Sequence, residues 1–271
     1  MTASHAAHRT FLGRARALVG MVHLGALPGT PRGGQSVEEI AAAAVAEATA
    51  LAAAGFDAVL VENMHDAPYL QRRVGPEITA AVAVCAAAVR HAVRVPVGVQ
   101  VLGGANDSAL AAAHAAGAAF IRAEGFVFSA VADEGVLQEA DAGPLLRLRR
   151  AIGAEAVLVA ADIQKKHSSH AITGDLDVAA HARAAEFFGA DAVIVTGPET
   201  GRATSLDDLR AVRQATRLPL VVGSGASPDS LPRLLEHADA VIVGSWLKRD
   251  GDWRNPLDPA RMEAMVRARD R

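Results

Sequence analysis

The sequence predicts a single (β/α)8 barrel, and two observations support this fold class. Eight short apolar runs, rich in β-branched residues, alternate with longer alanine-rich stretches along the 271 residues. Such nearly continuous apolar runs are typical of strands buried on both faces of a parallel sheet. In addition, eight strand–helix units fit the usual barrel size of about 250 residues. The alternative is an open doubly wound sheet, which usually carries a glycine-rich nucleotide-binding turn after its first strand. Val22–Gly29 does not match that turn.

The expected strands are the apolar runs, taken in chain order. Each is short and is followed by a glycine, a polar residue or a turn before the next alanine-rich stretch. They are Ala17–His23, Ala58–Glu62, Val97–Val101, Phe120–Glu124, Ala156–Asp162, Ala192–Thr196, Leu220–Gly223 and Ala240–Val243.

The stretches between these strands predict helices, because alanine is the best helix former and the chain contains 61 alanines. Ser36 precedes the first stretch and Glu39 stands at its third helical position, which is the pattern of a capping box. Ser205 precedes another helix whose first turn is acidic. The expected helices are Val37–Ala54, Glu77–Val93, Ser108–Ala116, Leu145–Ile152, Val178–Phe188, Leu206–Thr216, Ser230–His237 and Pro259–Arg269.

Composition excludes several classes of function. With 51% hydrophobic residues the chain can bury a core, and a net charge of −3 offers no footprint for nucleic acid. Cys85 is the only cysteine, so no disulfide can form within the chain, which fits a cytoplasmic location. No apolar run reaches the length of a membrane span. We expect a flexible tail over residues 1–16 and one domain over residues 17–271.

In a barrel, the active site lies where the strands end. Three acids, Glu62, Glu124 and Asp162, end predicted strands, and their convergence is costly unless a cation or a basic side chain compensates it. Further polar residues at these ends are Arg122 and Gln164. We predict catalytic roles for Glu62, Glu124, Asp162, Lys165 and His23, and substrate contacts from Asn63, Gln100 and Thr196.

The last two strand ends predict a phosphate site. Gly223, Ser224 and Gly225 follow the seventh strand, and Gly244 and Ser245 follow the eighth. Many barrels bind a phosphate with these two loops, where glycines let backbone N–H groups approach the anion and serines add hydroxyl donors.

Two alternatives concern lysine and metal chemistry. Lys165 could form a Schiff base or hold a phosphate, and Asp162 could act as a general base. A divalent cation bound by His23, Glu62, Glu124 and Asp162 is the alternative to a site without metal. His167 and His170 give a much weaker metal signal, since their spacing of three lies outside a helix. No other cofactor is predicted.

Three long loops are expected above the same face of the barrel, and loops of such length are usually functional. They are Asn63–Pro76, Gly125–Gly143 and Gly197–Thr204, the last as a mobile lid. Arg72, Arg73 and Arg202 would make this mouth attractive to anions. Four histidines are expected on outer helix faces with no role in the site: His91, His114, His181 and His237.

Motifs along nearly the whole chain resemble the BtpA/SgcQ family, whose name comes from a role in photosystem I biogenesis. The matching stretches are Val19–Pro31, Gly55–Met64, Val99–Asp107, Ile121–Phe126, Ala161–His167, Thr196–Gly201 and Val222–Gly225. The resemblance implies a barrel of the ribulose-phosphate-binding type, but it fixes no reaction.

Together these features predict an enzyme that acts on a phosphorylated sugar or a nucleotide-like sugar by isomerase, epimerase or lyase chemistry. A metal-dependent hydrolase and a non-catalytic assembly or stability factor are the alternatives. The alanine-rich outer helices also lead us to expect a homo-oligomer.

Overall fold

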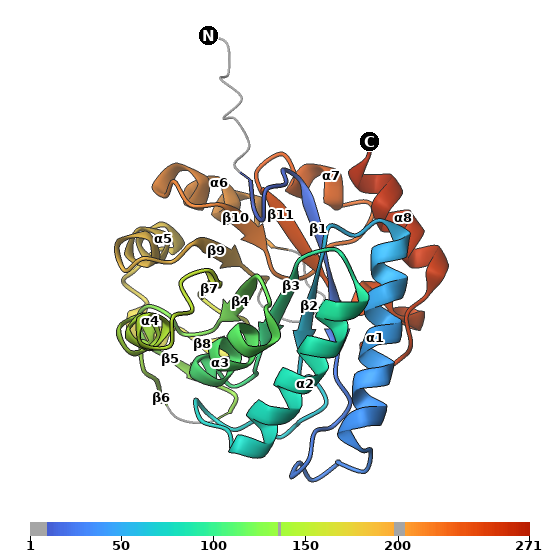
Figure 1. Ribbon diagram of the computed structural model, residues 1–271. Helices are drawn as coiled ribbons and strands as arrows, with labels where there is room; N and C mark the ends of the chain where they lie inside the picture. The colour runs from blue at the N-terminus through green and yellow to red at the C-terminus, as the bar shows by residue number, and fades with distance from the viewer. Residues whose placement is uncertain (1–9, 135–136, 198–203) are drawn as a thin grey trace.

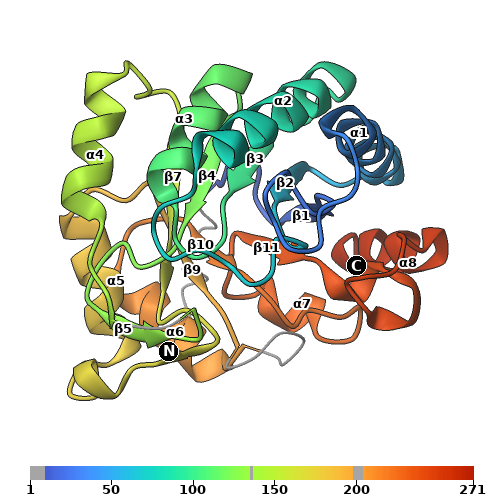
Figure 2. The same cartoon turned by 90° about the horizontal axis from the view of Figure 1, so that it is seen from below.

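The computed structural model describes residues 10–134, 137–197 and 204–271, and within them eight parallel strands close into a barrel. The order around the barrel is β1-β11-β10-β9-β7-β4-β3-β2, with helices around the outside (Figures 1 and 2). The predicted (β/α)8 barrel is therefore confirmed. The strands are β1 (Ala17–His23), β2 (Ala58–Glu62), β3 (Val97–Gln100), β4 (Phe120–Ala123), β7 (Leu158–Ile163), β9 (Ala192–Val195), β10 (Leu220–Val222) and β11 (Ala240–Val243).

The helices lie where they were predicted, with ends that differ by up to three residues. The Ser36–Glu39 capping box is present, and Ser205 accepts a hydrogen bond from the backbone N–H of Asp208. The largest difference at a C-terminus is α7, which ends at Leu234 rather than His237. The helices are α1 (Val37–Ala54), α2 (Pro76–Ala92), α3 (Asn106–Ala116), α4 (Ala142–Ala151), α5 (Val178–Phe187), α6 (Leu206–Ala215), α7 (Leu231–Leu234) and α8 (Pro259–Arg269).

A small antiparallel sheet occupies part of the predicted loop 125–143. It is formed by β5 (Ala130–Ala132), β6 (Leu137–Gln138) and β8 (Ser168–Ser169), in the order β6-β5-β8. The sequence did not predict these strands, because each has only two or three residues and pairs with a partner from another loop. The sheet fixes the segment after β7 against the loop after β4.

Side chains that alternate along the strands fill the barrel. Phe120, Leu60 and Met21 point inward, so the residues two positions further along each strand, Arg122, Glu62 and His23, also point inward near the strand ends. Gly98 makes room for Phe120, since a Cβ atom on Gly98 would lie 2.2 Å from the ring atom Cζ. The barrel thus has an apolar lower interior and a polar upper end.

Phe11 closes the opposite end of the barrel, where the strands begin. It is 2% exposed and packs edge-on against Phe120, with ring centroids 5.3 Å apart. The predicted tail over residues 1–16 therefore needs correction at its C-terminal end, because Phe11 is part of the core. Its first nine residues lie outside the described residues.

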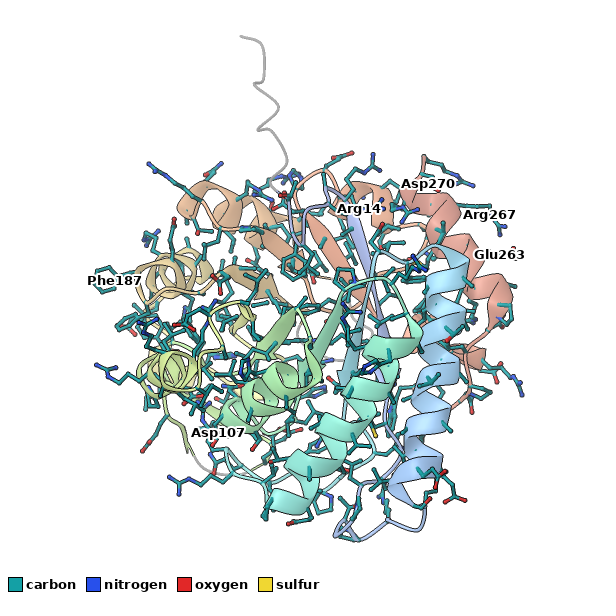
Figure 3. All side chains as sticks on the ribbon, in the orientation of Figure 1. Arg14, Asp107, Phe187, Glu263, Arg267 and Asp270 are labelled. Atoms are coloured by element: carbon teal, nitrogen blue, oxygen red, sulfur yellow. The ribbon has the colours of Figure 1, made fainter. Side chains whose placement is uncertain are left out.

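Two features of the outer surface concern the predicted partners, namely a membrane and a second copy of the chain. Among the helices of the described segments, none has both the length and the apolar character needed to cross a membrane. Phe187, at the end of α5, is 85% exposed and projects from the molecule beside Phe188 (Figure 3). The homo-oligomer stays a prediction.

Candidate functional site

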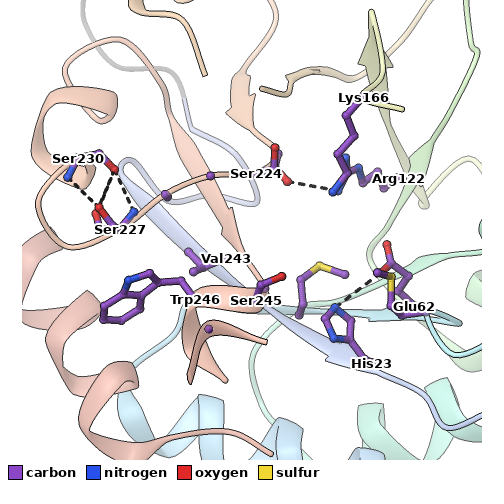
Figure 4. Close-up of a pocket in the computed structure, with 17 residues that line it drawn as sticks. His23, Glu62, Arg122, Lys166, Ser224, Ser227, Ser230, Val243, Ser245 and Trp246 are labelled. Carbon is purple, nitrogen blue, oxygen red and sulfur yellow. Dashed lines mark hydrogen bonds and ion pairs between the residues drawn. The ribbon is translucent and has the colours of Figure 1, made fainter. Parts of the chain in front are cut away.

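A cavity of about 450 Å³ opens where the barrel strands end (Figure 4). It combines residues from strands at both ends of the sequence, which barrel closure brings together. Predicted site residues that line it are His23, Glu62, Gly223, Ser224, Gly225, Gly244 and Ser245. Arg122, which the sequence placed at a strand end without assigning it a role, also lines the cavity. Lining residues that the sequence did not place in the site include Met21, Met64, Lys166, Ser227, Ser230 and Trp246.

One side of the cavity is formed by the two glycine–serine loops. Gly223 must be a glycine, since a Cβ atom there would lie 2.6 Å from Ile194 and 2.8 Å from Thr196. Gly225 has a φ of 75°, which side chains rarely adopt. The Ser224 hydroxyl accepts a hydrogen bond from the Gly197 N–H at 3.3 Å, which links this loop to the one after β9. The backbone of the loop therefore lies close to the cavity, as an anion site requires.

Glu62 is the acid that faces the cavity. Its side chain extends from the last residue of β2 and is buried. Burial raises the pKa of Glu62 to about 7, and the nearby Glu124 and Asp162 add to the rise, although Arg122 and Lys166 act against it. A carboxyl group with such a pKa can both donate and accept a proton near neutral pH.

His23 lies next to Glu62, with Nε2 3.7 Å from Oε2. Strand pairing explains this position, because His23 of β1 stands opposite Glu62 of β2 in the sheet register. Burial lowers the pKa of His23 to about 3, and the positive charge of Lys248 contributes. His23 is therefore a neutral imidazole at physiological pH and cannot offset the charge of Glu62.

Asp162, for which the sequence predicts a catalytic role, is not among the residues that line this cavity. Arg122 donates two hydrogen bonds to it, from Nε at 2.8 Å and from Nη2 at 3.1 Å. Burial alone would lower the pKa of Arg122, but the contact with Asp162 raises it. The other guanidinium nitrogen lies 3.5 Å from the Gly223 carbonyl oxygen. Arg122 thus neutralises a buried acid and contacts the glycine–serine loop.

The two neighbouring lysines separate in space. Lys165 Nζ lies 3.1 Å from Glu124 and 3.2 Å from Glu134, and this lysine is not among the cavity residues. Lys166 lines the cavity, and its backbone N–H donates to Thr196 Oγ1 at 3.1 Å. Burial and the nearby Arg122 lower the pKa of Lys166, although Glu62, Asp162 and Glu124 act against this shift. Of the two lysines, Lys166 and not the predicted Lys165 therefore lines this cavity.

The remaining predicted contacts support the site from outside the cavity. Gln100 Nε2 donates to Glu124 at 3.1 Å, so Glu124 is held by Gln100 and Lys165. The Asn63 side chain bonds Asp66 and the backbone N–H of Leu102, at 2.9 and 2.7 Å. Thr196 anchors Lys166. Glu124, Gln100, Asn63 and Thr196 are thus positioned to hold the site rather than to line the cavity.

The alternative metal site is not assembled. In the described ranges, no three His, Cys, Asp or Glu side chains are grouped so that they could hold an ion. Of the proposed ligands, Asp162 is paired with Arg122 and Glu124 with Lys165. His170 instead contacts the carbonyl oxygen of Lys165 at 3.0 Å, within its own loop. Two of the three converging acids, Asp162 and Glu124, are thus compensated by basic side chains.

The arginines predicted at the mouth of the barrel do not line the cavity in the described residues. Arg72 is directed at backbone carbonyls of Gly104, Glu124 and Gly125, so it braces loops rather than the cavity. Arg73 is exposed and lines a different hollow. Arg202 and most of the predicted lid lie outside the described residues.

Three of the four histidines predicted on outer helix faces lie at least partly at the surface. His91 and His114 are exposed, and His237 is half-buried. His181 is only 2% exposed and packs against Phe128, so the prediction of an outer position is wrong for this residue.

Known proteins are similar to this chain over nearly its whole length. The sequence profile of the BtpA family matches residues 14–271. This chain belongs to the BtpA family. The photosystem I biogenesis protein BtpA of Synechocystis is 37% identical, over 93% of this chain and 87% of that protein. An uncharacterized mitochondrial protein of Caenorhabditis elegans is 40% identical, over 94% of each chain.

Solved structures share the barrel at low sequence identity. Tryptophan synthase of Mycobacterium tuberculosis aligns with a TM-score of 0.60 and 17% identity, over 94% of this BtpA-family chain and 92% of that chain. Phosphoribosyl anthranilate isomerase of Thermus thermophilus aligns with a TM-score of 0.56 and 14% identity, over 93% and 97%. These similarities establish the fold.

Proposed function

We propose that this BtpA-family barrel is an enzyme that acts on a phosphorylated sugar or nucleotide-like sugar through acid–base chemistry. One observation carries the proposal: a single cavity contains both the glycine–serine loops and the Glu62 carboxyl group, whose pKa is about 7. The loops suit a phosphate, and Glu62 suits a proton transfer elsewhere on the same bound molecule.

The cations of the cavity fit the same substrate. Arg122 contacts the carbonyl oxygen of Gly223, and Lys166 lines the same cavity. A phosphorylated substrate would bring negative charge into a pocket that already holds Glu62, so these two cations would attract the anion. They would also stabilise negative charge that develops on a substrate oxygen after a proton is removed. A base beside a cation suits isomerase, epimerase and lyase chemistry in which a proton is removed and negative charge develops on oxygen.

Names of related proteins support the phosphate part of the proposal. Phosphoribosyl anthranilate isomerase and a thiamine phosphate pyrophosphorylase of Pyrococcus furiosus share the fold, and both names contain a phosphorylated group. The cavity loops of this chain have the composition that a phosphate site requires.

Binding measurements test the proposal directly. Isothermal titration with pentose and hexose phosphates, each beside its unphosphorylated sugar, should show binding that needs the phosphate. Ser224→Asp places a negative charge in the loop and should abolish that binding. Ser36→Asp is the matched control, because it adds the same charge at an exposed helix cap that tolerates aspartate. Absence of binding by every phosphate ester would overturn the proposal, and would favour the role that the Synechocystis protein's name describes.

A further inference from the structure

One carboxyl group and one imidazole lie side by side on the same wall of the cavity. Glu62 ends β2 and His23 ends the neighbouring strand β1, and the two residues stand opposite each other in the sheet register. His23 Nε2 and Glu62 Oε2 are 3.7 Å apart, which is longer than a hydrogen bond (Figure 4). Among the described residues that line the cavity, Glu62 is the only carboxylic acid. Both side chains can therefore reach one bound molecule from the same side.

The cations of the cavity come from strands on the far side of the barrel. In the circular order of the eight strands, β7 stands opposite β1, and β4 is the neighbour of β7. Lys166 follows β7, and Arg122 extends from β4. Burial lowers the pKa of Lys166, whereas nearby acids act to keep it protonated, and arginine is always charged. These cations can stabilise negative charge on a substrate oxygen, but neither can take up a proton from a carbon atom. A carbon in this cavity can thus lose a proton only towards the wall of β1 and β2.

The imidazole of His23 also lies against the second glycine–serine loop. A Cβ atom on Gly244 would be 3.6 Å from His23 Nε2, so the backbone of this loop passes close to the ring. The side chain is 5% exposed, and burial lowers the pKa of His23 to about 3. A neutral imidazole has one N–H donor and one acceptor nitrogen, so it can give one proton and take another without changing its net charge. A sugar whose phosphate is held by Gly244 and Ser245 would therefore lie beside both His23 and Glu62.

The geometry points to an aldose–ketose isomerase that uses a single base. We infer that Glu62 moves a proton between C1 and C2 of an open-chain aldose phosphate on one face, while His23 moves a second proton between O1 and O2. This inference rests on the proposed function and selects one of its reaction types. An epimerase that inverts a carbon by removing and returning a proton needs proton-transferring groups on both faces of that carbon. Across the cavity from Glu62 and His23 stand the cations Arg122 and Lys166.

The proposed steps balance without an oxidant, a reductant or a second substrate. The Glu62 carboxylate takes the proton from C2, the electrons of that bond form the C1–C2 double bond, and O1 takes a proton from the N–H of His23. The ring nitrogen then takes the proton of the O2 hydroxyl group, so that the C2–O2 double bond forms. Glu62 returns its proton to C1 on the same face. The ketose phosphate leaves, and Glu62 and His23 regain their starting protonation states.

Isotope exchange tests the single-sided proton transfer. The full chain is incubated at neutral pH in deuterium oxide with ribose 5-phosphate, glucose 6-phosphate or glyceraldehyde 3-phosphate, beside heat-inactivated protein, and the products are followed by NMR. We expect a ketose phosphate with one deuterium at C1, in only one of the two stereochemical positions, because the proton returns to one face. An aldose inverted at C2 as the main product, or deuterium at both C1 positions from the first turnover, would overturn the inference.

Variants assign the two roles, and a neighbouring histidine supplies the matched control. Glu62→Gln should slow the conversion by about 10²–10⁴-fold, and His23→Gln by about 10²-fold or more. His23→Gln should leave the affinity for ribitol 5-phosphate unchanged, whereas damage to the fold would weaken binding as well. His65→Gln should keep full activity, because His65 packs on Trp253 and is not among the cavity residues. An equal loss in His65→Gln and His23→Gln would contradict the role of His23. The deuterium pattern needs no variant, so it decides the stereochemistry even if a variant fails to fold.

Calorimetry separates failure of the isomerase from failure of the phosphate site. Ribitol 5-phosphate has no carbonyl group and cannot react, but it should still bind. If phosphate esters bind and no aldose phosphate that binds is converted to a ketose, the isomerase inference is wrong while the proposed function stands. If no phosphate ester binds, the proposed function fails as well.

Discussion

Arg122 holds both carboxylate oxygens of Asp162, with nitrogen–oxygen distances of 2.8 and 3.1 Å. This pair is almost completely buried, at 4% and 3% exposure. It explains how three acids can meet at one end of the barrel. Asp162 is neutralised by Arg122 and Glu124 by Lys165, while Glu62 faces the cavity with a raised pKa. Each acid thus has a different chemical environment, although all three lie within one residue of the end of a barrel strand.

Breaking the Arg122–Asp162 pair should be costly. Asp162→Asn leaves a buried guanidinium without its counter-charge, and the free energy of unfolding should fall by about 3–5 kcal/mol in urea titrations. Replacing both partners, with Arg122→Met and Asp162→Leu, should cost less than Asp162→Asn alone, because no unpaired charge remains. A loss below about 0.5 kcal/mol for Asp162→Asn would place it with ordinary surface changes and contradict the buried pair.

Glu62→Gln should remove activity and raise stability at alkaline pH. Glutamine cannot transfer a proton, so turnover should fall by about 10²–10⁴-fold once a substrate is identified.

Burial raises the pKa of Glu62 from 4.5 to about 7. The folded chain therefore keeps a proton that the unfolded chain loses in this interval, and the associated stability is present at low pH and is lost as the pH rises to about 7.

The stability difference has a defined pH window. At pH 8, Glu62→Gln should be more stable than the natural sequence by on the order of 3 kcal/mol, and near pH 4.5 the two should be similar. Urea unfolding at both pH values measures this. Glu38→Gln, at an exposed position of α1, is the control and should show little difference at either pH. Equal stability of Glu62→Gln and the natural sequence at pH 8 would argue against a buried, raised Glu62.

His23→Gln should make the fold less sensitive to acid. Burial lowers the pKa of His23 from 6.5 to about 3. The unfolded chain takes up a proton below pH 6.5 that the folded chain refuses, so stability is lost as the pH falls from 6.5 towards 3. The slope is about 1.4 kcal/mol per pH unit for one proton. Thermal unfolding between pH 7 and 4 should show a smaller loss for His23→Gln, whereas the exposed His91→Gln should follow the natural sequence.

Phe11→Ala should show that the packed domain begins before β1. Removing a buried ring that contacts Phe120 leaves a cavity, and the free energy of unfolding should fall by about 3 kcal/mol or more. Phe187→Ala removes the same side chain from a position that is 85% exposed, so it should change stability little. If the two variants unfold at the same urea concentration, Phe11 does not close the barrel in solution.

Several site residues follow from the sequence because strand side chains alternate. His23, Glu62 and Arg122 each stand two positions after an inward residue of the same strand, so the alternation that identifies the core also identifies them. The sequence placed Arg122 at a strand end without a role, and this signal could have assigned it to the cavity together with Glu62. The glycine–serine loops follow in the same way, since the order of strands around a barrel brings the last two loops together.

By itself, the sequence determined the barrel, the positions of its helices and the end at which the polar residues gather, because periodicity and strand count are local properties. Only the tertiary structure decided which of Lys165 and Lys166 faces the cavity. Strand alternation stops at Ile163, and Gln164 turns the chain with a φ of 50°, so counting along the strand no longer predicts direction. Likewise, which acid receives a basic partner depends on distances between different strands, and those exist only when the barrel closes.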